Sequence, residues 1–84
     1  MKEAYIGFPS LTEAQRASDF LGRNRCRNRL VRMPSLPGKS SCAYGLLLAG
    51  ERLDAALGII RSGGWRIGRV LLRETDGTLR EREP

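Results

Sequence analysis

The 84-residue chain contains no histidine, only two cysteines and few aromatic residues. Histidine is the commonest general base and a frequent zinc ligand, so its absence argues against Ser-His-Asp and Cys-His enzymes and against most zinc sites. Two cysteines cannot by themselves supply the ligands of a zinc or iron–sulfur centre. We therefore expect no cofactor and no bound metal.

Long apolar runs are also missing from the chain. No run approaches the ~20 residues that a membrane-spanning helix requires. The first residues show none of the features of a secretory signal. We therefore expect a soluble cytoplasmic protein with reduced thiols and no membrane partner.

Basic residues outnumber acidic residues by fifteen to nine. Residues 1–73 carry a net charge of +8, whereas residues 74–84 carry −2. We expect residues 1–73 to form a single domain and residues 74–84 to form a disordered, charged C-terminal tail, because this tail is polar and aperiodic. The small basic domain favours anionic partners, and the alternative is an arginine-rich surface that is merely solvated.

Apolar periodicity predicts four strands, at residues 4–8, 30–33, 42–48 and 65–73. Ser10 and Glu13 predict a capping box at the start of a first helix: the Ser10 side chain accepts from the Glu13 amide, and the Glu13 side chain reaches back. Gly22 is expected to end this helix. A second helix follows from an apolar stripe at helical spacing, formed by Leu53, Ala56, Leu57 and Ile60.

The resulting order, βαββαβ, predicts an α+β protein with the ferredoxin-like plan. This plan is a four-stranded antiparallel sheet with both helices on one face. Its strand order, 4-1-3-2, would place Cys42 at the sheet edge where Ser10 begins the first helix. Cys26 would lie at the opposite edge, roughly 17 Å away at ~3.3 Å per residue. A disulfide between the two cysteines is therefore not expected.

The predicted surroundings of Cys42 favour a reactive thiol. A helix N-terminus and nearby cations would stabilise its thiolate and lower its pKa. Ser10, Ser40 and Ser41 would help to stabilise the anion, and Lys39 or Arg66 would add positive charge. The alternative for any strand cysteine is a small buried core residue, and this interpretation is favoured for Cys26.

Two short segments, Phe-Pro-Ser at residues 8–10 and Ser-Ser-Cys at residues 40–42, resemble motifs of the selenium/sulfur carrier protein-like family of short bacterial proteins. The resemblance covers residues 4–72. In this resemblance Cys42 corresponds to the family's characteristic cysteine, and Pro34 corresponds to the proline before its serine-rich loop. Two features depart from the family pattern: Ser35 stands in place of an arginine, and Gly45 does not directly follow the cysteine.

The resemblance implies a sulfur or selenium carrier. Cys42 would hold the chalcogen as a persulfide or perselenide and pass it from a donor protein to an acceptor protein by thiol exchange. Such a protein requires a reactive cysteine and no general base. Whether the chain is an enzyme stays open, with a carrier favoured over a conventional catalyst.

Two other functions remain open, and Cys42 would be structural in both. A nucleic-acid-binding module would contact phosphates with the five arginines of residues 23–32, and its binding would weaken with salt and survive the loss of Cys42. A protein-interaction module would form a homodimer through the sheet face that the helices leave open. The residues expected on that face are Tyr5, Tyr44, Leu46 and Leu48.

Overall fold

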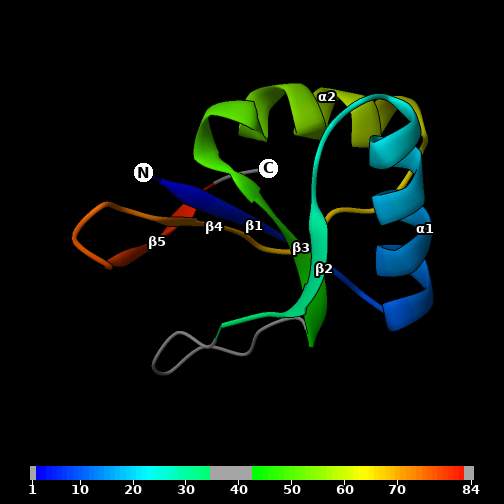
Figure 1. Cartoon of the computed structure of the whole chain (residues 1–84). Coiled ribbons are helices and arrows are strands. Elements are labelled where there is room, and N and C mark those ends of the chain that lie inside the picture. Colours follow the sequence, from blue (N-terminus) through cyan, green and yellow to red (C-terminus); the bar gives the residue numbers. More distant parts are fainter. Residues whose placement is uncertain (1, 35–42, 83–84) are drawn as a thin grey trace.

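The computed structural model describes residues 2–34 and 43–82, and in this part of the chain it contains two helices and a five-stranded antiparallel sheet (Figure 1). This confirms the predicted α+β class. The elements in chain order are β1 (Glu3–Phe8), α1 (Leu11–Arg23), β2 (Arg29–Arg32), β3 (Tyr44–Ala49), the short 3-10 helix η1 (Gly50–Arg52), α2 (Leu53–Ser62), β4 (Val70–Arg73) and β5 (Leu79–Arg82).

The strands lie side by side in the order β2-β3-β1-β4-β5. The first four follow the predicted order, with β1 paired to both β3 and β4. The predicted number of strands is wrong, because β5 adds to the outer edge of β4. This strand lies within residues 74–84, which the sequence indicated to be a disordered tail.

A tight turn between β4 and β5 explains the fifth strand. The Asp76 carboxylate accepts from the Thr78 amide at 2.9 Å, and Gly77 adopts a φ of 90°, which suits glycine. The Glu74 amide donates to the Thr78 carbonyl at 2.8 Å and closes the hairpin. Leu79 then packs against the sheet. The turn, the pairing with β4 and the packing of Leu79 together order a segment that is otherwise charged.

Both helices pack on the same face of the sheet. Figure 1 shows α1 and α2 on one side of the strands. Their buried residues, such as Leu21 in α1 and Ile60 in α2, share one core with Ile6, Phe8 and Leu46 from the sheet. The alternation of buried side chains along β1 and β3 therefore directs one set to the helices and the other set to the opposite face.

A smaller apolar cluster lies on the opposite face, around Tyr5, Met33 and Leu71. The prediction that Tyr5 lies on this face is confirmed. The prediction is wrong for three β3 residues, Tyr44, Leu46 and Leu48, because these belong to the core under the helices or pack against it. The register explains the error: Leu46 pairs with Ile6, and a shift of one residue along a strand moves a side chain to the other face.

The fourth strand is shorter than the predicted residues 65–73 because its ladder is interrupted near Gly7. The Gly7 amide donates to the Arg69 carbonyl at 2.7 Å, and the Gly7 carbonyl accepts from the Gly68 amide at 2.8 Å. Gly7 of β1 thus faces two residues, Gly68 and Arg69, as in a β-bulge. Trp65 lies before this point and packs on Phe20 of α1, with ring centroids 4.8 Å apart.

Candidate functional site

Ser10 caps α1, as predicted. Its Oγ accepts from the Glu13 amide at 3.2 Å, and its backbone is extended. The reciprocal bond from the Glu13 side chain, which a full capping box requires, is absent among the described residues. Phe8, just before Ser10, pairs with Tyr44 at the start of β3. The first turn of α1 therefore begins where β3 starts, at an edge of the sheet that is formed by strand ends and not by an outer strand.

Arg66 reaches the same edge through the segment that precedes β4, since Gly68 bonds to Gly7 near the end of β1. Its side chain is exposed, and no hydrogen bond or ion pair joins it to Ser10 within residues 2–34 and 43–82. The remaining predicted site residues, Lys39, Ser40, Ser41 and Cys42, lie outside the described residues. Ala43, which follows Cys42 in the sequence, is described, and its carbonyl accepts from the Met33 amide at 3.1 Å.

Cys26 is a buried free thiol, 4% exposed, in the core under the helices. Burial raises its pKa above the ordinary thiol value, and the positive charge of Arg52 opposes this shift only in part. A buried, protonated thiol is a poor nucleophile. The interpretation of Cys26 as a core residue is therefore confirmed.

The backbone at the end of α1 explains why Cys26 is buried. The Cys26 amide donates to the Leu21 carbonyl at 2.8 Å, and the Arg25 amide donates to the Gly22 carbonyl at 3.1 Å. These two bonds form a Schellman motif, in which the apolar residue after the left-handed residue packs on the last turn of the helix. Arg25 occupies the left-handed position with a φ of 61°. The helix thus ends beyond Gly22, which the sequence indicated as its stop.

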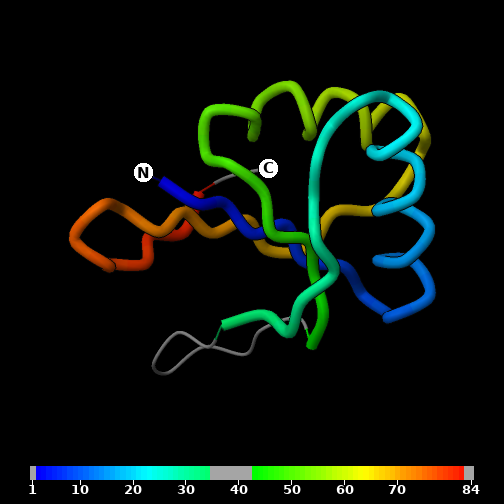
Figure 2. The backbone as a smooth tube through the Cα atoms, viewed as in Figure 1, coloured from blue at the N-terminus to red at the C-terminus, as the bar shows by residue number. Residues whose placement is uncertain are grey.

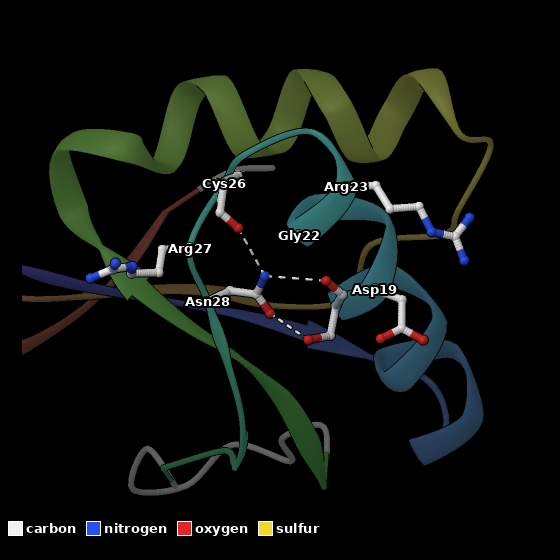
Figure 3. A pocket seen from close by; sticks show the side chains of 7 residues that line it. Asp19, Gly22, Arg23, Cys26, Arg27 and Asn28 are labelled. Carbon is white, nitrogen blue, oxygen red and sulfur yellow. Dashed lines mark hydrogen bonds between the residues drawn. The ribbon is translucent and has the colours of Figure 1, made fainter.

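Asn28 fixes the rest of the connection from α1 to β2. Its Oδ1 accepts from the Ser18 hydroxyl at 2.6 Å, and its Nδ2 donates to the Ser18 carbonyl at 3.2 Å and the Cys26 carbonyl at 3.0 Å (Figure 3). A shallow, open pocket of about 450 Å³ adjoins these residues. We call this set of bonds the Asn28 clamp. It holds the connection, which arches from α1 down into β2 in Figure 2, against the side of α1.

Exposed arginines alternate with less exposed residues along the connection that the Asn28 clamp holds. Cys26 and Asn28 are buried or partly buried, whereas Arg25, Arg27 and Arg29 are exposed. The connection therefore presents three arginines at alternate positions on its outer side. In Figure 3 Arg27 extends to the side of the connection opposite Arg23.

These three arginines line a groove of about 600 Å³ together with Arg52 of η1 and Lys2. We call it the arginine groove. The end of β3, residues 47–49, forms its apolar part. Among the described residues, Glu3 is the one acidic residue that lines it. The groove lies at the sheet edge opposite Ser10, because Glu3 starts β1 and pairs with Ala49 at the end of β3.

Most of the positive charge in the arginine groove is not neutralised within the molecule. Lys2 pairs with Glu74 at 3.3 Å, and Glu3 pairs with Arg73 at 3.9 Å. In the part of the chain that the structure describes, the four arginines of the groove make no ion pair with an acidic residue. The arrangement is suited to binding an anion that brings several negative charges.

The sequence indicated part of this groove through its run of five arginines at residues 23–32. It did not indicate Arg52 and Lys2, which lie far away in the sequence and come together with the run only in the folded chain. It also grouped Arg23 and Arg32 with the others, although neither lines the groove.

No protein-family model, curated protein or solved structure matches this chain. Neither of the helices in residues 2–34 and 43–82 is long and apolar enough to cross a membrane. The same residues hold no group of three histidine, cysteine or acidic side chains placed to bind a metal ion.

Proposed function

We propose that the protein is a small ferredoxin-like carrier of sulfur or selenium in the cytoplasm, with Cys42 as the residue that holds the chalcogen. The proposal starts from the resemblance of residues 8–10 and 40–42 to the carrier-like family. The structural observation that supports it is the burial of the other thiol, that of Cys26, because a carrier requires a sulfur that its partners can reach.

The burial of Cys26 argues against a carrier role for this residue and so supports the assignment of Cys42 by elimination. The residue is 4% exposed, burial raises the pKa of its thiol, and its backbone is held by the Schellman motif at the end of α1. A persulfide at this position would require the end of the helix to open. Cys42 is the remaining cysteine of the chain.

The described neighbours of Cys42 in the sequence are compatible with a reactive thiol. Ala43 bonds to Met33 at the edge where β2 ends and β3 begins. The same edge carries the first turn of α1, whose amides bear partial positive charge. Arg66 is exposed near this edge and brings a full positive charge.

The proposed transfer needs no oxidant and no general base. The Cys42 thiolate attacks the outer sulfur of a donor persulfide, the donor S–S bond breaks, and the donor leaves as a thiolate. Cys42 then carries the outer sulfur and its proton as a persulfide. An acceptor thiolate takes this sulfur in the same way and regenerates the Cys42 thiolate. A selenium carrier would follow the same steps with selenium as the transferred atom.

The test is sulfur loading by a low-molecular-weight persulfide, read by intact mass, followed by transfer to an acceptor thiol. Wild type and Cys26→Ala should each gain one sulfur atom and release it to the acceptor, and Cys42→Ser should gain none. Native alkylation at neutral pH should label Cys42 rapidly. Loading of Cys42→Ser equal to wild type, or a Cys42 that alkylates only after denaturation, would overturn the proposal.

A further inference from the structure

The arginine groove is independent of the proposed carrier site. It lies at the opposite edge of the sheet, since β1 runs from Glu3 beside the groove to Phe8 before Ser10. This strand of six residues separates the two edges by roughly 17 Å at ~3.3 Å per residue. Phosphates bound by the residues of the groove therefore do not contact the edge at Ala43, and only nucleotides beyond the groove could reach it.

We propose that the arginine groove binds the phosphodiester backbone of a nucleic acid. Four guanidinium groups line it, and guanidinium donors match phosphate oxygens in bidentate geometry. Arginine remains charged at every physiological pH, so binding does not depend on a titrating group.

The arrangement of the arginines favours a linear polyanion. Arg25, Arg27 and Arg29 alternate with the anchored residues Cys26 and Asn28 and so present a row of charges on one side of the connection. A nucleic acid carries a negative charge on every nucleotide and matches such a row at any position along its length. An acidic peptide would need acidic side chains at matching intervals, so a nucleic acid is the simpler occupant.

The composition of the groove also defines how the nucleic acid is recognised. Within residues 2–34 and 43–82 no aromatic residue lines it, so this part of the groove offers no ring on which a base can stack. Contacts to phosphate fix the position of a strand without reading its sequence. Binding is therefore insensitive to base sequence and strongly dependent on salt.

The row of arginines is formed before the ligand binds. The Asn28 clamp and the Schellman motif fix the connection on both sides of Arg27. Arg25 occupies a left-handed backbone conformation in which a non-glycine residue is strained. The fold therefore fixes the backbone of these charged residues in the unbound protein, which lowers the entropic cost of binding.

The test measures binding of fluorescently labelled single-stranded oligouridine by anisotropy over a range of salt concentrations. On a single strand, each phosphate contact makes the slope of log K, where K is the association constant, against log salt concentration more negative by about 0.7. Four contacts therefore predict a slope of about −3. Arg27→Gln/Arg29→Gln should reduce this slope by about 1.4 and weaken binding about tenfold or more. A mixed-sequence oligonucleotide should bind as tightly as oligouridine.

The matched control is Arg16→Gln/Arg61→Gln, which removes two exposed arginines from the helices and leaves the groove intact. This control should keep the wild-type slope. Cys42→Ser should also bind normally, so a failure of the carrier proposal leaves this result unaffected. Arg25→Gly should weaken binding without loss of stability, which separates lost charge from misfolding.

Three results would overturn the proposal. The first is the absence of oligouridine binding at low salt. The second is an equal loss of binding in the groove variant and the helix variant, which would mean that the whole basic surface attracts the probe. The third is tighter binding of polyglutamate than of oligouridine, which would assign the groove to an acidic protein.

Discussion

The strained backbone at Arg25 leads to a prediction with an unusual sign, because replacement by glycine should stabilise the protein. Arg25 has a φ of 61°, and a side chain in the left-handed region costs about 1–2 kcal/mol. Glycine removes this strain but loses about 0.5–1 kcal/mol through the greater freedom of the unfolded chain. From the middle of each range, the net gain for Arg25→Gly is about 0.5–1 kcal/mol.

For a domain of this size, such a gain raises Tm by about 2–8 °C. Thermal unfolding followed by far-UV circular dichroism measures it directly. The matched control is Arg27→Gly, which removes the same charge from the same connection at a residue without a positive φ. It should be destabilised by about 0.5–1 kcal/mol. Equal losses of stability in both variants would refute the strain argument.

Further predictions concern the caps, the core and the buried thiol. Ser10→Ala should lose about 1 kcal/mol in thermal unfolding through loss of the cap to Glu13, and Ser10→Asp should not. Gly45→Ala should lose about 1–3 kcal/mol, because its Cβ would lie 2.5 Å from the Ile6 carbonyl oxygen, whereas Gly58→Ala in α2 meets nothing within 4 Å and should gain about 1 kcal/mol. Burial raises the pKa of Cys26, so the unfolded chain loses this proton first as pH rises. The stability of wild type relative to Cys26→Ala, measured by urea unfolding, should therefore be largest at neutral pH and decrease above the ordinary thiol pKa; no change with pH would contradict this.

Much of the fold follows from local patterns in the sequence. The apolar stripes of the two helices and the alternation of strands and helices predicted the class of fold and the order of four strands. The burial of Cys26 was also predictable, since cysteine is commonly buried. These features depend on interactions within short segments or on the few topologies that such an order permits.

Features that depend on register or on distant contacts were not predictable from these patterns. The faces of Tyr44 and Leu46 follow from the pairing of β3 with β1. The strand β5 depends on the turn at Gly77 and on a neighbour already in the sheet. The arginine groove requires Arg52 to approach the end of α1 across the fold. Each of these contacts is long-range, and a local pattern contains no information about it.

The two outer strands of the sheet bear on how the protein behaves at high concentration. A sheet edge exposes unpaired amides and carbonyls, to which a strand of another molecule can add. Here β2 carries Arg29 and Arg32 and no acidic residue, and β5 carries Arg80 and Arg82 beside Glu81, so both outer strands have a net positive charge. Two copies that approached edge to edge would bring these like charges together. The charge on its outer strands thus disfavours growth of the sheet into fibres, even at concentrations where molecules collide often.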